Sequence, residues 1–262
     1  MGATREAADH PFPMLLRRSP KFRRPATDAP AAFDPSAAGT SESEWSRILR
    51  HSQAWSPHAG SLVVVSPHPD DEVLGAGGLM HTWSSRGLPV TVVSVTDGEA
   101  AFENSGSLGA LRQAELRAAL RKLSPSHIDV LRLGLPDGRV ADHRNKLRNS
   151  LADLLTGADH VVAPYEADGH PDHEAVGSVC REISASLNAD LVRYPIWRWH
   201  HGEIECLKAA QWGSFALSPQ ARRAKSQAVQ CFQSQLRTPG GRPIVPGRML
   251  DYFARPFEAF LL

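Results

Sequence analysis

Histidines and carboxylates gather in two short stretches of this sequence, about 100 residues apart. They are Pro67-His68-Pro69-Asp70-Asp71-Glu72 and His170-Pro171-Asp172-His173. Imidazole and carboxylate groups suit zinc and similar first-row ions, and a set of three ligands leaves one coordination position open for water. Such an ion lowers the pKa of the water towards about 7 and polarises a carbonyl oxygen. The two stretches together predict a metal-dependent hydrolase.

The same stretches contain groups for proton transfer. A carboxylate that does not hold the ion could take the proton of the water, and a protonated imidazole could stabilise an oxyanion or protonate the leaving group. The residue types alone do not say which carboxylate has which role. Each stretch also has a structural interpretation, since carboxylates favour the start of a helix and two histidines three residues apart could form a surface pair. The presence of both stretches in one chain favours the metal site.

Short β-branched runs alternate with helix-like stretches, which predicts the elements that position these residues. We expect strands at 62–66, 90–96, 128–133, 160–163 and 191–196, and helices near 73–86, 108–123, 144–155 and 174–187. A later strand at 214–217 precedes Ser218-Pro219, which predicts a helix to about Gln235, and an apolar segment runs from Met249 to Leu262. The alternation predicts an α/β fold: a Rossmann-like, mainly parallel sheet with helices on both faces.

In an open parallel sheet, ligands bind outside the carboxyl ends of the strands. Both histidine-containing stretches follow predicted strands directly, and so do Asp97-Gly98-Glu99, Asp137-Gly138 and the segment Trp197–His201. We therefore expect all of these groups at one edge of the sheet.

Composition bounds the remaining possibilities. The 262 residues carry 29 Lys plus Arg against 28 Asp plus Glu, a formal charge of +1, which disfavours nucleic acid as a partner. No apolar run approaches the roughly 20 residues of a membrane span, so no stable membrane insertion is expected. Three widely spaced cysteines favour reduced thiols and a cytoplasmic location. Residues 1–42, rich in Pro and Ala, are predicted to be a flexible arm, and 43–262 a single α/β domain.

The two histidine-containing stretches, at this separation and after a hydrophobic strand, resemble the LmbE and PIG-L type de-N-acetylases over roughly residues 61–187. The resemblance implies zinc, or another divalent first-row metal, and removal of an acetyl group from an N-acetylglucosamine-containing small molecule. It implies His68, Asp71 and His173 as metal ligands, Asp70 as general base and His170 as the electrostatic or acid partner. It also implies that Arg112, in Arg112-Gln113-Ala114-Glu115, and Asp137 hold the sugar.

The sequence departs from the family pattern at two positions. Pro67 stands where alanine is usual, and Asp168 stands where some relatives have a catalytic tyrosine. We expect Asp168 to bind a sugar hydroxyl or to orient His170, and Trp197 to form part of an aromatic wall for the substrate. The resemblance does not select one substrate among N-acyl sugars and glycoconjugates, and the oligomeric state stays open.

Two other functions are compatible with parts of the sequence. Metal-dependent phosphoester hydrolysis uses similar ligands. A nucleotide- or S-adenosylmethionine-binding domain could use Gly75, Gly77 and Gly78, with Asp97 on the ribose. A dinucleotide fingerprint needs its glycines directly after the strand, whereas these begin nine residues after Ser66 and follow three acidic residues. We interpret the glycines instead as permitting close helix packing.

Overall fold

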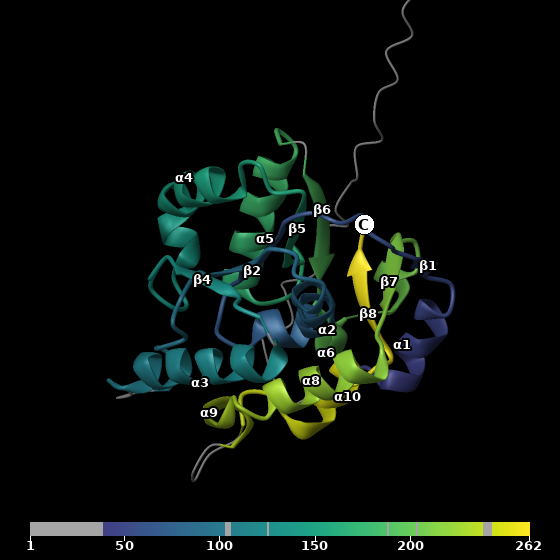
Figure 1. Ribbon diagram of the computed structural model, residues 1–262. Coiled ribbons are helices and arrows are strands. Elements are labelled where there is room, and N and C mark those ends of the chain that lie inside the picture. The colour runs from purple at the N-terminus through teal and green to yellow at the C-terminus, as the bar shows by residue number, and fades with distance from the viewer. Residues whose placement is uncertain (1–38, 103–105, 125, 188, 203, 238–242) are drawn as a thin grey trace, which may run out of the picture.

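The computed structural model describes residues 39–102, 106–124, 126–187, 189–202, 204–237 and 243–262 (Figure 1). Most of the predicted arm, 1–42, lies outside these residues, so the boundary at residue 42 stays a prediction. Helix α1 (Glu42–Leu49) begins with a capping box formed by Ser41 and Glu44. In the described part of the chain, no helix is both long and apolar enough to cross a membrane.

The described strands form one eight-stranded sheet. They are β1 (Gln53–Ala54), β2 (Leu62–Ser66), β3 (Val90–Ser94), β4 (Asp129–Arg132), β5 (His160–Pro164), β6 (Asp190–Tyr194), β7 (Trp212–Ala216) and β8 (Phe257–Leu261). Their order is β1-β7-β8-β6-β5-β2-β3-β4, and only β8 runs antiparallel to its neighbours β6 and β7. Each predicted strand is present with its ends shifted by at most two residues, and the predicted mainly parallel sheet is confirmed.

Helices cover both faces of the sheet, as predicted (Figure 1). The longer ones are α2 (Asp71–Ser85), α3 (Leu108–Leu123), α4 (Arg144–Leu155), α5 (Pro171–Ser184) and α8 (Pro219–Val229). The short ones are α6 (Arg198–His201), α7 (Ile204–Leu207), α9 (Gln233–Leu236), α10 (Leu250–Phe253), and the 3-10 turns η1 (Val140–His143) and η2 (Gly247–Met249). Helices α4 and α5 pack on one face, and α2, α3 and α8 on the other.

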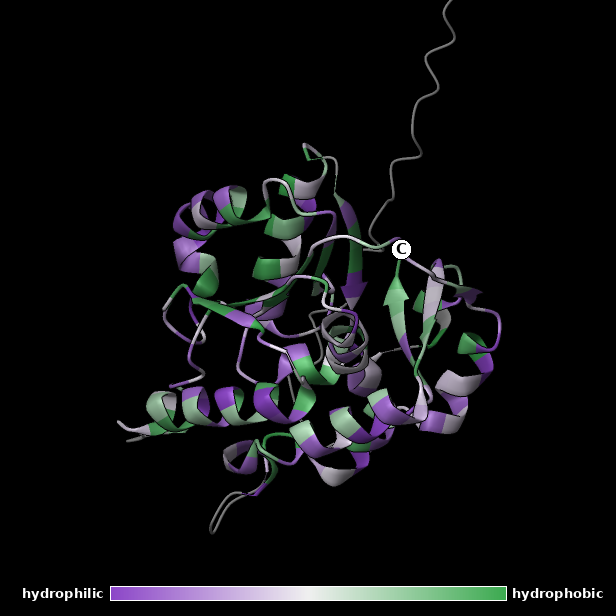
Figure 2. Ribbon diagram, viewed as in Figure 1, coloured by the Kyte–Doolittle hydropathy of each residue, from purple (hydrophilic) through white to green (hydrophobic). Residues whose placement is uncertain are grey.

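The central strand β2 shows why this sheet needs two helical layers. Leu62 and Val64 point into the core beneath α2 and α3, whereas Val63 and Val65 point into the core beneath α4 and α5. A strand covered on both faces is apolar at every position, and the central strands are accordingly green in Figure 2. The polar groups of the molecule are therefore left to the strand ends and the outer helix surfaces.

Two features of the C-terminal third differ from expectation. The helix that begins at Pro219 ends at Val229, and the chain turns through Phe232 before α9, so the predicted continuous helix to Gln235 is wrong. Phe232 is 1% exposed and packs into the core at the break, where its backbone (φ −84°, ψ 57°) leaves the helical conformation. The apolar C-terminal segment becomes β8, which fills the space between β6 and β7.

The glycines of α2 serve packing, as interpreted from the sequence. A Cβ atom on Gly75 would lie 2.4 Å from the ring of Tyr194, and one on Gly78 would lie 2.4 Å from Leu217. Helix α2 is kinked at Ala76 (φ −139°, ψ 17°), and beyond the kink Glu258 accepts hydrogen bonds from the backbone N–H groups of Gly78 and Leu79. Gly75, Gly77 and Gly78 are therefore buried within a helix and do not form a turn for a nucleotide.

Candidate metal centre

The two histidine-containing stretches meet at the carboxyl edge of the sheet. Helix α2 follows β2 and helix α5 follows β5, and these two parallel strands are neighbours although β3 and β4 lie between them in the chain. Strand order reverses at this point, and such a switch point is where open α/β sheets bind their ligands. His68 thus comes from the turn between β2 and α2, Asp71 from the first residue of α2, and His173 from the first turn of α5.

Three ligand atoms of these residues form a nearly equilateral triangle. Nδ1 of His68 lies 3.3 Å from Oδ2 of Asp71, Nε2 of His173 lies 3.2 Å from the same oxygen, and the two nitrogens are 3.3 Å apart. Tetrahedral zinc with bonds of about 2.0–2.1 Å requires ligand atoms about 3.3–3.4 Å apart. The side chains of His173 and Asp71 are almost fully buried and that of His68 is 12% exposed. The cluster therefore fits a first-row ion in both geometry and ligand chemistry.

A second set of carboxylates fixes the imidazole rings. Nε2 of His68 lies 3.1 Å from Asp137 and 3.2 Å from Asp172, and Nδ1 of His173 lies 2.9 Å from Asp168. An imidazole that donates its outer N–H to a carboxylate presents its other nitrogen to an ion in a fixed orientation. Burial alone would lower the pKa values of both histidines, but the surrounding carboxylates raise that of His173 to about 9 and that of His68 well above its usual range. These are the charge conditions of a site built for a cation.

Asp70 stands beside the cluster without belonging to the triangle. It has φ 139° and ψ −31°, the one positive φ found for a non-glycine residue in the described chain. Although it occupies the N-cap position of α2, its side chain makes no capping hydrogen bond, so capping does not explain it. Backbone strain of this kind costs about 1–3 kcal/mol and collects at functional sites. Burial, together with the negative charge of Asp71, raises the pKa of Asp70 well above its usual range.

Glu72 completes the acidic stretch but faces the protein interior. Its Oε2 accepts hydrogen bonds from the Ser66 hydroxyl (2.7 Å) and from the backbone N–H of Asp70 (3.3 Å). Burial raises its pKa to about 7. Glu72 therefore supports the turn that carries Asp70 and lies outside the pocket.

His170 is the N-cap residue of α5, and its ring lies against both histidines of the cluster. The ring centroids are 4.8 Å from His68 and 4.9 Å from His173. Burial and the two neighbouring imidazoles lower the pKa of His170 to about 3, which disfavours the protonated imidazole expected from the sequence. Its Nδ1 accepts a hydrogen bond from the backbone N–H of Asp172 (3.2 Å), which places the single proton of the neutral ring on Nε2.

A cavity of about 380 Å³ opens directly onto this cluster. Arg112 lines it and is only 3% exposed, yet its Nε and Nη2 make no hydrogen bond to a described residue. Trp197 lines the cavity and stacks on His170, with ring centroids 6.5 Å apart. The remaining lining includes His68, Asp70, Asp137, Gln235, Ile244 and Val245. A pocket with apolar walls and a few convergent polar groups is what a small-molecule site requires.

Asp168, expected to touch substrate, occupies a different position. It is fully buried, faces His173 rather than His170, and accepts hydrogen bonds from the backbone N–H groups of Ile196, Trp197 and Arg198 at 2.9–3.0 Å. Its oxygens are thus occupied by protein, and the predicted contact with a sugar hydroxyl is wrong. Asp168 instead ties His173 to the turn that carries Trp197.

Two further residues have positions that the sequence indicates only in part. Asp172, at the start of its helix, orients a histidine: it contacts His68 and also accepts from the N–H groups of Gly138 and Val140. Gln235 gives no signal in the sequence. Its side-chain amide donates to the carbonyl of Pro69 (2.7 Å), from 166 residues further along the chain.

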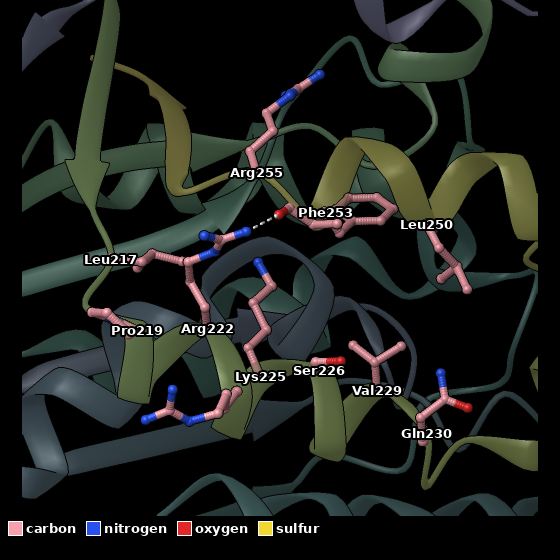
Figure 3. Close-up of a pocket in the computed structure, with 12 residues that line it drawn as sticks. Leu217, Pro219, Arg222, Lys225, Ser226, Val229, Gln230, Leu250, Phe253 and Arg255 are labelled. Atoms are coloured by element: carbon pink, nitrogen blue, oxygen red, sulfur yellow. Dashed lines mark hydrogen bonds between the residues drawn. The ribbon is translucent and has the colours of Figure 1, made fainter.

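A cavity of similar size, about 390 Å³, lies elsewhere, between α8 and the segment that contains α10 (Figure 3). Figure 3 shows Arg222 donating to the carbonyl of Ala254, and Lys225 points into the same space. Lys225 is paired with Glu258 (2.7 Å) and Arg255 with Glu42, so much of the positive charge is already neutralised. This lining holds no histidine or carboxylate, in contrast to the cavity at the sheet edge.

Fold and cluster together define a class: a doubly wound α/β protein whose topological switch point carries a His and Asp set able to hold a metal ion. Within that class, residues 63–184 match the model of the PIG-L family, described as GlcNAc-PI de-N-acetylase. The resemblance seen in the sequence is confirmed.

Curated relatives are named as deacetylases. A 1D-myo-inositol 2-acetamido-2-deoxy-alpha-D-glucopyranoside deacetylase of Nocardioides sp. is 28% identical over 64% of this chain and 66% of its own length. A probable N-acetyl-alpha-D-glucosaminyl L-malate deacetylase 2 of Bacillus subtilis is 32% identical over 50% of this chain and 64% of its own length. The match therefore spans slightly less than two thirds of either relative.

Among solved structures, a conserved protein of Thermus thermophilus is 26% identical, with a TM-score of 0.57 over 78% of this chain and 94% of its own. An N,N'-diacetylchitobiose deacetylase of Pyrococcus horikoshii is 20% identical, with a TM-score of 0.60 over 86% of this chain and 93% of its own, and supports the fold alone.

Proposed function

We propose that this protein is a zinc-dependent de-N-acetylase that hydrolyses the acetamide, or another N-acyl amide, of an N-acetylglucosamine-type sugar or glycoconjugate. The observation that carries the proposal is the triangle of ligand atoms from His68, Asp71 and His173, with sides of 3.2–3.3 Å, at the floor of a pocket that also contains Asp70. Deacetylation is the activity in the names of both curated relatives described above.

His68, Asp71 and His173 would hold the ion. When bound, zinc supplies Lewis acidity, which acidifies water and polarises the amide carbonyl. Asp70 takes the proton of the attacking water, because it is the cluster's neighbouring carboxylate that is not used as a ligand and because its raised pKa makes it a stronger base than an ordinary aspartate. As the C–O bond forms and the C–N bond breaks, the same carboxyl returns this proton to the departing nitrogen.

His170 acts as a neutral hydrogen-bond donor in this proposal. With Nδ1 held by the backbone of Asp172, its Nε2–H is the donor offered to the developing oxyanion. A neutral imidazole keeps this function over a wide pH range because no proton has to be gained. The role therefore stays electrostatic, without transfer of a proton from His170.

Arg112 and Trp197 would hold the sugar. Two buried guanidinium nitrogens of Arg112, Nε and Nη2, have no hydrogen-bond partner among the described residues and suit hydroxyl oxygens, and the Trp197 ring suits the apolar face of a sugar. Asp137 lines the pocket, but one of its oxygens contacts His68 and the other accepts from the N–H of Ala100. We therefore assign Asp137 first to the orientation of His68 and only secondly to the substrate.

Acetate release tests this proposal. Zinc-loaded protein is incubated with a panel of N-acetylated glucosamine derivatives, from the monosaccharide to glycoconjugates, and with phosphate monoesters as the competing class. Acetate from at least one amide substrate, absent in the Asp70→Asn variant, is the expected result. Phosphate release, or acetate release that survives Asp70→Asn and chelation, would overturn the proposal.

A further inference from the structure

A second cluster of metal-ligand type lies at the opposite edge of the sheet, at the amino ends of the strands. It consists of His58, from the loop before β2, His160, the first residue of β5, and Asp190, the first residue of β6. We propose that these three residues bind a divalent first-row ion of the zinc class, independently of the pocket. We call them the edge cluster.

The sheet itself brings two of the ligands together. His160 and Asp190 are register partners in the parallel pair β5 and β6, and the N–H of Asp190 donates to the carbonyl of Asp159 (2.9 Å). Nδ1 of His160 lies 3.6 Å from Oδ2 of Asp190. The pairing of a histidine with a carboxylate is therefore fixed by strand register and does not depend on surface side-chain rotamers.

The hydrogen bond made by His160 fixes the tautomer of its neutral ring. Nε2 lies 2.8 Å from the backbone carbonyl of His58, and a carbonyl only accepts, so Nε2 carries a proton. In the neutral ring Nδ1 is then unprotonated and carries a lone pair. It is buried in a residue with 0% exposure and has no hydrogen-bond partner among the described residues. A buried nitrogen left in this way costs about 1–3 kcal/mol unless something binds it.

The surroundings of this lone pair point to a cation. Nδ1 of His160 faces Oδ2 of Asp190, and that same oxygen lies 4.0 Å from Nδ1 of His58. In the neutral ring the lone pair and the carboxylate oxygen repel each other, and a positive ion between them would turn this repulsion into attraction; at 3.6 Å the two atoms are too far apart for a hydrogen bond. Two imidazoles and one carboxylate favour zinc-class ions over magnesium or calcium, which prefer oxygen ligands.

The second support comes from how the cluster is held. The outer N–H of His160 donates to a backbone carbonyl, which is the usual support of a metal-bound histidine. The ring also packs edge-on against Trp83, with centroids 5.8 Å apart, and Trp83 donates to the carbonyl of Gly60. The loop that carries His58 is thereby anchored close to His160. The side chains of His58 and Asp190 are each 65% exposed, so both can rotate towards a common ion.

An ion at the edge cluster would tie three segments together: the loop before β2 and the starts of β5 and β6. Because these segments lie on the opposite edge from the pocket, binding there should affect stability and leave catalysis unchanged. The inference does not depend on the proposed deacetylase function.

Zinc stoichiometry on the full chain tests the edge cluster. Metal-free protein is dialysed against Zn²⁺ in the presence of a weak competing chelator, and bound zinc is counted per chain. We expect two equivalents for the wild type, one for the His58→Ala/Asp190→Asn variant and one for the Asp71→Asn/His173→Ala variant. The exposed pair His127 and Asp129, whose Nε2 and Oδ1 atoms are 3.1 Å apart but lack a third ligand, provides the matched control His127→Ala/Asp129→Asn, which should keep two.

The outcomes separate the two sites. If the wild type binds one equivalent of zinc and His58→Ala/Asp190→Asn still binds it, the proposal for the edge cluster is wrong. The same holds if the control His127→Ala/Asp129→Asn loses as much zinc as His58→Ala/Asp190→Asn does. If the wild type binds one equivalent of zinc and the His58→Ala/Asp190→Asn variant binds none, the edge cluster is supported and the pocket site is contradicted.

Thermal unfolding gives an independent readout. In the Asp71→Asn/His173→Ala background, Zn²⁺ at about 100 times its dissociation constant should raise Tm by on the order of 5 °C. Adding His58→Ala should abolish this shift. A shift that persists without His58 would show that the bound zinc lies elsewhere.

Discussion

The pocket cluster (His68, Asp71 and His173) and the edge cluster offer an ion the same ligand types, two imidazoles and one carboxylate. They differ in how closely the ligand atoms are already placed and in how deeply they are buried. In the pocket cluster the ligand atoms are 3.2–3.3 Å apart and almost fully buried. In the edge cluster the distances to the carboxylate are 3.6–4.0 Å, and two of the three side chains are 65% exposed. The difference lies in what surrounds the ligands.

The pocket cluster has a second layer of carboxylates, which the edge cluster lacks. Asp137, Asp172 and Asp168 hold the two imidazoles at 2.9–3.2 Å, whereas His160 has only a backbone carbonyl. Ligands fixed in this way lose little freedom when an ion binds, so affinity rises. Asp70 adds a base beside the ion, whereas the carboxylate next to the edge cluster, Asp159, is exposed and accepts hydrogen bonds from the N–H and the hydroxyl of Ser61. The ligand set thus makes a metal site possible, while its neighbours decide between catalysis and stability.

Removing the base should have the largest effect. Asp70→Asn removes a proton acceptor but no ligand, so kcat should fall by about 10²- to 10⁴-fold while the zinc content of the pocket stays unchanged. In the wild type, activity should fall as pH drops through the raised pKa of Asp70, because the protonated carboxyl accepts no proton. Activity and zinc content of the variant are measured together. Loss of zinc in Asp70→Asn but not in Asp71→Asn would exchange the two roles.

His170 should have the next largest effect. Loss of one oxyanion donor costs about 10²- to 10³-fold in kcat, and His170→Ala should show a loss of this size. Because the pKa of His170 is lowered to about 3, the ring stays neutral from about pH 5 upward, so the variant should keep whatever basic limb the wild type has. The pH profile of kcat/KM for both proteins provides the measurement. If the basic limb of the wild type disappears in His170→Ala, the result would support a protonated His170 and contradict the neutral form proposed above.

Asp168→Asn tests the second layer directly. Replacing the carboxylate that holds Nδ1 of His173 should weaken zinc binding by about 10- to 100-fold, with a smaller loss of activity at saturating zinc. Glu166→Gln is the matched control, since Glu166 lies two residues away and pairs with Arg181 and Arg193 instead. Zinc affinity is measured by competition with a chromophoric chelator. Equal affinities in the wild type and in Asp168→Asn would mean that the second layer does not distinguish the two clusters.

The sequence predicts the fold and the two ligand-bearing stretches because their signals are local, whereas the choice of His68, Asp71 and His173 among them rests on the resemblance to the family. Hydrophobic runs fix the parallel strands, and the ligands stand directly after strand ends that the sheet brings together. The contact predicted between Asp168 and substrate is wrong because sequence position alone does not tell whether a carboxylate points into a pocket or into the protein. The sequence does not predict the edge cluster, because His160 and Asp190 are the first residues of their strands and ligands are expected at the carboxyl ends.

Other features depend on contacts between distant segments. Gln235 reaches Pro69 across 166 residues, and Ser234 donates to Glu115 across 119. The antiparallel strand β8 pairs with the edges of β6 and β7, and the local pattern of residues 257–261 does not predict this position in the sheet. Such features follow from packing of the whole chain.

Glu72→Gln should change stability in a pH-dependent way. Burial raises the pKa of Glu72 from 4.5 to about 7, so the folded state holds its proton more tightly than the unfolded state does. Its stabilising contribution is therefore complete below about pH 4.5 and is lost as pH rises through about 7, by at most on the order of 3 kcal/mol. Relative to the metal-free wild type, Glu72→Gln should gain stability between about pH 5 and pH 8, as measured by urea unfolding. A constant difference across this range would show that Glu72 is already ionised when buried.

Stepwise chelation should produce the smallest change in activity. The edge cluster must draw its ligand atoms together from 3.6–4.0 Å, while those of the pocket cluster already lie 3.2–3.3 Å apart. A chelator of graded strength should therefore remove the edge ion first, and activity should stay within about twofold of its starting value until the second equivalent leaves. Bound zinc and acetate release are followed in the same samples, with Asp190→Asn, which should lack the silent first step, as the control. Activity that falls in proportion to the first equivalent removed would mean that the more weakly bound ion is the catalytic one. The pocket cluster would then bind zinc more weakly than the edge cluster, the reverse of what the two geometries indicate.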